Sequence, residues 1–196
     1  MKHGLTPSQT AGPYFAYGLT PGQYGYQGNG PAGSNLLVEG IKGKPIRIEG
    51  RVFDGEGIVI IDAMLEIWQA DSDGKYPGGP DQRGDNSAFA GFGRVGTGTD
   101  PENRFFIDTI KPGQVDEKQA PHLNVVVFMR GLLTHVCTRI YFSDESDAND
   151  ADPVLQMVPA ERRQTLIAQR EETSGIPVYR FDIHMQGDKE TVFFDY

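Results

Sequence analysis

Cysteine is nearly absent from this chain of 196 residues, which contains only Cys137. A single cysteine excludes an intrachain disulfide and any zinc cluster built from several cysteines. The first residues lack the apolar core of a signal peptide. No run approaches the roughly 18 consecutive apolar residues of a membrane span. We therefore expect a cytoplasmic protein without a membrane segment.

Positive charge is also scarce. The chain has 18 lysines and arginines against 27 acidic residues, a formal net charge of −9. Proteins that bind nucleic acids gather basic side chains against the phosphate backbone, so this balance argues against a nucleic-acid partner.

Glycine and proline are abundant, at 25 and 13 residues. This excess argues against a helical bundle and favours short strands joined by tight turns. Apolar and polar residues alternate over 46–53, as in a half-buried strand, and Trp68 is predicted to lie in the core. One helix is expected from about Pro159 to Glu172. Further strands are predicted at 58–61, 64–68, 105–110, 123–129, 134–142, 178–186 and 190–194. The fold class is all-β, a β-sandwich with long loops, an extended N-terminal arm and one short helix.

The N-terminal arm differs in composition from the rest. Residues 1–36 include eight glycines, four prolines and four tyrosines but only one charged side chain, Lys2. Disordered tails are usually charged and poor in aromatics, so an extended segment lying on a surface is expected, either its own or a partner's. We divide the chain into an interface arm, residues 1–45, and a sandwich domain, residues 46–196.

Two stretches resemble ligand-binding motifs, but their neighbouring residues do not fit those motifs. Residues 91–96 match the glycine spacing of a dinucleotide loop, but TGTDP follows and cannot start the helix that such a loop requires. Residues 71–74 resemble the start of a calcium loop, yet Tyr76 and Gln82 stand where a glycine and a glutamate are needed. A turn is expected at 71–74 and a solvated acidic loop at 143–152.

Among the four histidines, only His122 enters an apolar strand where a site residue could sit; His3 lies in the arm, while His135 and His184 fit structural or solvent-facing positions. One histidine alone does not make a metal site, so a structural role is favoured. Cys137 is interpreted as a small buried hydrophobe. Arg130 stands at the tip of a predicted hairpin. Two roles are possible for it: a solvated turn residue, or a side chain that contacts an anion.

Several segments, taken in order along the whole chain, resemble the intradiol ring-cleaving dioxygenases. They are TPSQTAGPY (6–14), LEIWQAD (65–71), TIKPG (109–113), APHLN (120–124), TRIYF (138–142), YRFDI (179–183) and ETVFFDY (190–196). The resemblance implies a β-sandwich and O2-dependent cleavage of 3,4-dihydroxybenzoate to 3-carboxy-cis,cis-muconate. It also implies non-haem Fe(III) held by two tyrosines and two histidines.

This chain departs from that ligand pattern. The family's His-x-His pair is His122-Leu-Asn124 here, and Gln114 to Asp116 stand where a ligand tyrosine follows the KPG segment. Tyr76 is aligned with an earlier, non-ligand position. At most one of the four ligands remains, so the resemblance implies no metal and no catalytic residue in this chain, with Fe(III) bound by a catalytic β chain of the same enzyme.

The resemblance also implies that the arm wraps this catalytic partner in a hetero-oligomer. Thr10, Gly12, Pro13 and Tyr14 would line the partner's active site, and Arg130 would lie near the substrate. The alternative is a stand-alone β-sandwich binding module without catalysis. A self-sufficient dioxygenase is contradicted by the missing ligands.

Overall fold

The computed structural model describes residues 10–27, 32–78 and 88–195. Eight strands hydrogen-bond in the order β4-β3-β6-β7-β8-β9-β1-β5, and two short strands, β2 and β10, pair in parallel beside them. The strands are β1 (Pro45–Gly50), β2 (Val52–Phe53), β3 (Met64–Gln69), β4 (Phe92–Gly96), β5 (Phe105–Ile110), β6 (His122–Phe128), β7 (Val136–Phe142), β8 (Ile167–Glu171), β9 (Val178–Arg180) and β10 (Ile183–His184).

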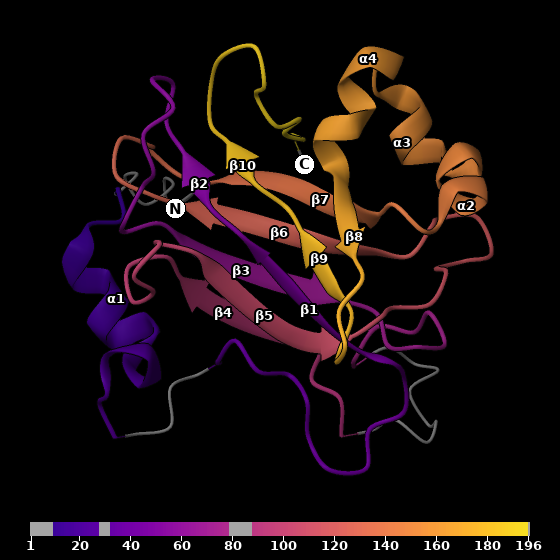
Figure 1. Cartoon of the computed structure of the whole chain (residues 1–196), viewed down its shortest axis with the longest axis horizontal. Coiled ribbons are helices and arrows are strands. Elements are labelled where there is room, and N and C mark those ends of the chain that lie inside the picture. The colour runs from indigo at the N-terminus through magenta and orange to yellow at the C-terminus, as the bar shows by residue number, and fades with distance from the viewer. Residues whose placement is uncertain (1–9, 28–31, 79–87, 196) are drawn as a thin grey trace, which may run out of the picture.

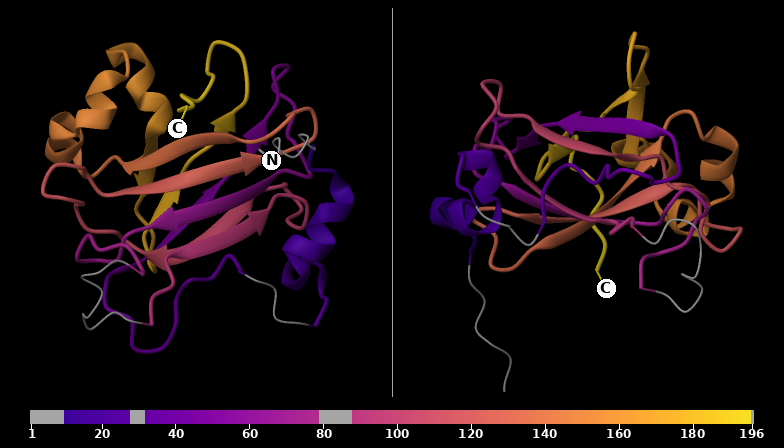
Figure 2. Two further views of the ribbon diagram at one scale, coloured as in Figure 1. Left: turned by 180° about the vertical axis from the view of Figure 1, so that it is seen from behind. Right: turned by 90° about the horizontal axis from the view of Figure 1, so that it is seen from below.

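The sheet folds over so that its two ends, β4 and β5, come close together (Figure 1). Seen from below, the strands form two stacked layers (Figure 2). Burial alternates along the strands, and Ile46, Ile48, Val125 and Val127 point into one shared core. Alternating apolar side chains from both layers bury each other, which confirms the predicted β-sandwich.

Helices are more numerous than predicted. The described residues contain four short α helices, of which α1 lies at one end of the sandwich and the other three at the opposite end (Figure 1). They are α1 (Pro13–Leu19), α2 (Ser146–Ala151), α3 (Pro153–Met157) and α4 (Ala160–Arg163), with 3-10 turns η1 (Pro21–Tyr24) and η2 (Gln164–Leu166). The predicted helix to residue 172 is therefore wrong in its second half. Ile167–Glu171 instead forms β8, because pairing with β7 and β9 outweighs local helix propensity.

Other local predictions also failed. Residues 58–61 and 190–194 form no strand, only the single bridges Phe53–Val59 and Cys137–Phe194. Residues 92–96, where no strand is predicted, form β4, and residues 79–87 of the same region lie outside the described residues. Trp68 is 37% exposed rather than core, because it lies on the outer face of β3.

The arm is partly helical instead of extended, since residues 13–19 form α1. Beyond α1 it docks on the edge strand β4 of its own sheet. The Gln23 side chain accepts a hydrogen bond from Gly96 N (2.7 Å) and donates one to Gly96 O (3.2 Å). It thereby satisfies backbone groups that an edge strand would otherwise leave unpaired. The first nine residues lie outside the described residues.

Candidate functional site

A buried hydrogen-bonded chain surrounds His122, the first residue of β6, which is 1% exposed. Its Nδ1 lies 2.7 Å from Ala120 O, and since a carbonyl can only accept, Nδ1 carries the proton. Nε2 is then an acceptor and lies 3.3 Å from the Tyr76 hydroxyl. The Tyr76 oxygen in turn accepts from Asn124 Nδ2 at 2.9 Å. Both ring nitrogens of His122 are therefore engaged.

Tyr76 covers this cluster from the outer face of the sheet. Its ring stacks on Trp68 with centroids 5.8 Å apart and an interplanar angle of 16°. The turn at 71–74 brings it there, because Asp71 Oδ1 accepts from Asp73 N and Lys75 N and folds the chain back over β3. The predicted turn is confirmed. The space beside His122 is thus occupied by aromatic side chains.

Burial keeps His122 neutral. Its pKa is lowered from 6.5 to about 4, chiefly because burial disfavours the charged ring. The hydrogen bond to Ala120 opposes this shift, and the nearby positive charge of Arg139 adds to it. At neutral pH the ring is a hydrogen-bonding group without charge.

Asp152 anchors the other side of this cluster. It is fully buried, and its carboxylate accepts from Ala120 N, Tyr141 OH, Val154 N and Leu155 N at 2.8–3.2 Å. The last two bonds cap α3. The segment 143–152, predicted as a solvated loop, therefore supplies α2 and a buried carboxylate.

The residues around His122 do not fit a ferric ion. Within the part of the chain that the structure describes, no three or more His, Cys, Asp or Glu side chains converge as metal ligands. Tyr76 and His122 offer one phenol and one imidazole, but the third position is the Asn124 amide. The positive charge of Arg139 lies close enough to depress the His122 pKa and would equally repel a metal cation.

Tyr76 is the site residue that the sequence interpretation missed. The sequence interpretation assigns Tyr76 to a non-ligand position and predicts no contact for it; in the structure its hydroxyl lies 3.3 Å from His122 Nε2. Two sequence features could have indicated this contact: the turn residues that follow β3 and the aromatic pair Trp68 and Tyr76, eight positions apart.

A second group of predicted residues meets at the β6–β7 turn. Thr10 Oγ1 donates to Met129 O at 3.3 Å, which places the arm next to Arg130. Arg130 is 60% exposed and its Nε lies 2.5 Å from Asp62 Oδ2. Gly12 is half-buried, Pro13 begins α1, and Tyr14 is 84% exposed. The structure thus brings Thr10 next to Arg130, while Tyr14 is exposed on α1.

Two other candidates from the sequence carry no chemistry. Residues 92–96 form β4, paired antiparallel with β3, so the glycine motif is not a phosphate loop. Cys137 is half-buried, and burial raises the pKa of its thiol, which disfavours the reactive thiolate. No described helix is long and apolar enough to cross a membrane.

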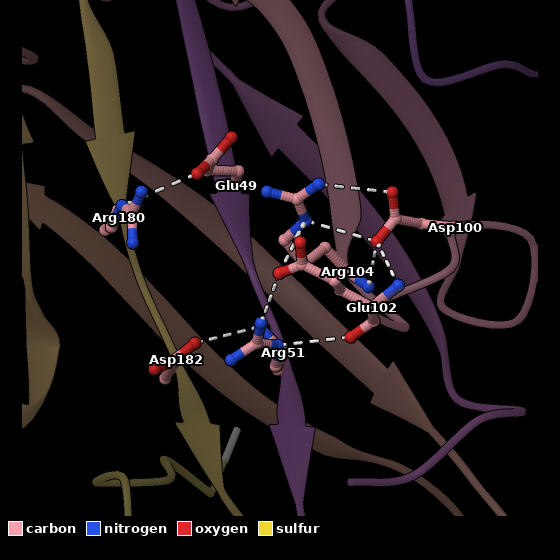
Figure 3. A network of polar contacts seen from close by, with 7 residues as sticks. All are labelled: Glu49, Arg51, Asp100, Glu102, Arg104, Arg180 and Asp182. Atoms are coloured by element: carbon pink, nitrogen blue, oxygen red, sulfur yellow. Dashed lines mark hydrogen bonds and ion pairs between the residues drawn. The ribbon is translucent and has the colours of Figure 1, made fainter.

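A network of charged residues lies on the other layer of the sandwich, with four acids around three arginines (Figure 3). Its arginines all contact acids: Arg51 with Glu102 at 2.7 Å, Arg104 with Asp100 at 3.1 Å, and Arg180 with Glu49 at 3.5 Å. The Arg180–Glu49 pair joins β9 to β1, while the other two pairs hold the turn that contains Asp100 and Glu102. Because each of these arginines is paired with an acid, the network offers no unpaired positive charge to an anionic ligand.

Comparison with known proteins decides the family. The family model described as "Dioxygenase" matches residues 35–187, which span most of the sandwich. The chain belongs to the intradiol dioxygenase family. A solved intradiol ring-cleavage dioxygenase from Tetranychus urticae has the same fold, with a TM-score of 0.61 at 18% identity over 93% of this chain and 94% of that one.

Within the intradiol dioxygenases, two curated relatives align over nearly the whole chain. The protocatechuate 3,4-dioxygenase alpha chain of Burkholderia cepacia is 54% identical over 97% of this chain and 96% of its own length. The alpha chain of Pseudomonas putida is 43% identical with the same coverage. The beta chain of Burkholderia cepacia is more distant, at 30% identity over 86% of this chain and 77% of its own.

Proposed function

We propose that this chain is the subunit without iron in a two-chain intradiol dioxygenase. The assembled enzyme cleaves 3,4-dihydroxybenzoate with O2 to 3-carboxy-cis,cis-muconate. The high identity to two alpha chains over almost the full length supports this assignment, since the beta chain is less similar. The family is one of non-haem iron enzymes, and in this proposal the ferric ion belongs to the catalytic β chain.

The observation that carries the proposal is the filled space beside His122. Tyr76 closes it, Asn124 bonds Tyr76, and both nitrogens of His122 have partners. A chain that held iron here would have to break these bonds and place a cation near Arg139. The polar atoms are instead satisfied by one another, as in a structural core.

The contribution of this chain to the reaction is to build part of the partner's active-site wall. Thr10, Gly12, Pro13 and Tyr14 lie on the interface arm, residues 1–45, and cover the substrate against water. The exposed guanidinium of Arg130 binds the substrate's carboxylate, because its planar N–H groups match that geometry. The assembly is expected in the cytoplasm.

Expression of the chain alone and together with its catalytic partner tests this function. We expect iron-free, inactive protein alone, and ferric, ring-cleaving enzyme only from co-expression. Stoichiometric iron and activity in the single chain would contradict the assignment. Failure to form a complex would instead favour the stand-alone binding module.

Deletion of residues 1–14 tests the arm. The truncated chain should still fold, because the core cluster begins at Leu36, but the assembled enzyme should lose activity. A fully active complex with the truncated chain would show that the arm does not line the site.

A further inference from the structure

Asp62 is a carboxylate held on a rigid turn just before β3. Its side chain is only 10% exposed. The flanking backbone is fixed by the buried Thr97, whose hydroxyl donates to Ile60 O (2.8 Å) and accepts from Ala63 N (3.2 Å). Thr97 N also donates to Ala63 O at 3.1 Å. These bonds leave the Asp62 backbone little freedom to move.

The charge of Asp62 is matched by Arg130. The Arg130 Nε atom lies 2.5 Å from Asp62 Oδ2, and no other cation among the described residues pairs with this carboxylate. The contact is an ion pair by distance, since Oδ2 accepts no aligned hydrogen bond within the described chain. A largely buried carboxylate without a counter-ion is costly, so Asp62 depends on Arg130 for its charge balance.

The geometry leaves one edge of Arg130 available. Asp62 occupies the Nε side of the guanidinium, and the two Nη atoms have no partner among the described residues. Arg130 is 60% exposed at the turn that follows β6, next to Gly131 with φ +93°. An unrestrained arginine at such a turn would sample many rotamers, at about 2 kcal/mol of side-chain entropy.

The N-terminal arm converges on the same place. Thr10 hydrogen-bonds Met129 O, one residue before Arg130. Further along the arm, a Cβ added at Gly98 would lie 3.2 Å from the Tyr24 hydroxyl and 2.4 Å from Ile61 O, so Tyr24 lies beside the residue that precedes Asp62. Three segments distant in sequence therefore meet around one ion pair.

We propose that Asp62 is a positioning residue, which holds Arg130 by Nε so that its Nη edge faces the carboxylate of the aromatic substrate in the assembled enzyme. This inference rests on the proposed function and adds a specificity role to it. Asp62 itself does not touch the substrate. Because Asp62 already orders the Arg130 side chain in the free enzyme, little side-chain entropy is lost when a carboxylated catechol binds.

The test uses the enzyme co-expressed with its catalytic partner, with kcat and KM measured for 3,4-dihydroxybenzoate and for its carboxylate-free analogue 4-methylcatechol. The variants are Asp62→Asn, Asp62→Glu, Arg130→Ala and the Asp62→Asn/Arg130→Ala double variant. The control is Asp108→Asn, which breaks the similar pair Arg47–Asp108 (2.7 Å) between β1 and β5. Complex formation is verified by size-exclusion chromatography.

We expect Arg130→Ala to raise KM for the carboxylated substrate about tenfold or more, with little change for 4-methylcatechol. Asp62→Asn should raise the KM for the carboxylated substrate about three- to tenfold, since only the ordering of Arg130 is lost. Asp62→Glu should recover part of this loss, and the double variant should be no worse than Arg130→Ala. Asp108→Asn should leave the ratio of the two KM values unchanged.

Each other outcome has a distinct meaning. If Arg130→Ala shifts the KM ratio and Asp62→Asn does not, the positioning role is overturned and the proposed function stands. If Asp62→Asn lowers activity equally for both substrates, its role is structural and the inference is overturned. If Arg130→Ala does not shift the ratio, Arg130 does not bind the carboxylate and the inference falls with that contact. Absence of ring cleavage in the wild-type complex would overturn the proposed function itself.

Discussion

His122 should make the folded chain lose stability as the pH falls from 8 to 5. The ring is buried against Ala120, Tyr76 and Tyr141, and its pKa in the folded state is about 4. In the unfolded chain the pKa returns to the ordinary 6.5. Between these two values the unfolded state binds more protons than the folded state, so the free energy of unfolding decreases as the pH falls.

The size of this effect follows from the difference between the two pKa values. At about 1.4 kcal/mol for each pKa unit, the full contribution is about 3 kcal/mol, present above pH 6.5 and lost as the pH falls through 4. At pH 5 the loss is about 2 kcal/mol, because the unfolded ring is then almost fully protonated and the folded ring is not.

Urea unfolding of the purified chain at pH 8 and pH 5 measures this contribution. Wild type is compared with His122→Gln, which lacks the titrating ring. The pH-dependent change in unfolding free energy that comes from the carboxylates is the same in both proteins and cancels in the difference. We expect the wild type to lose about 2 kcal/mol more than the variant between the two pH values. His135→Gln, at an exposed position just before β7, is the matched control.

Equal losses in wild type and His122→Gln would refute the reasoning. They would mean that the ring is solvated in solution, and that the hydrogen-bonded cluster of Tyr76, His122 and Asn124 is not maintained. The space beside His122 would then not be closed by these side chains.

Three further changes probe other parts of the fold. Asp152→Ala should lower the free energy of unfolding by about 3 kcal/mol or more, because it leaves buried N–H groups and the N-terminus of α3 without an acceptor. The control Asp150→Ala, at an exposed position, should have little effect in the same urea assay. Gln23→Ala should cost about 1–2 kcal/mol locally and speed hydrogen exchange and proteolysis of the arm, since the edge of β4 loses its partner. Gly74→Ala should destabilise the chain by more than about 2 kcal/mol on chemical unfolding. The residue has φ +76°, and an added Cβ would lie 1.8 Å from Gln114 O. Unchanged stability would disprove this close approach.

The strands that could be predicted from the sequence are those whose pattern is local. Alternation over 46–53 and 105–110 marks one buried face, and these segments form β1, β2 and β5. Glycine and proline content indicated a β fold with many turns. Segments such as 65–71 and 120–124 carried the family resemblance, because they are recognised by their residues and their order along the chain.

The segments that were predicted wrongly depend on partners far away in the chain. Ile167–Glu171 has helical character by itself, but becomes β8 because β7 and β9 present free backbone groups on either side. Trp68 is apolar in a strand and was therefore assigned to the core. In the structure it faces outward, where Tyr76 covers it after a turn that no periodicity indicates.

The sequence by itself therefore determined the β-sandwich and the family, since these depend on residue type, spacing and alternation. Only the tertiary structure decided what fills the space beside His122 and what holds Arg130. The hydroxyl of Tyr76 and the carboxylate of Asp62 reach their partners across 46 and 68 positions of sequence. Hydrogen bonds and ion pairs act over a few ångströms in space, and the folding of the sheet alone brings these atoms within that range.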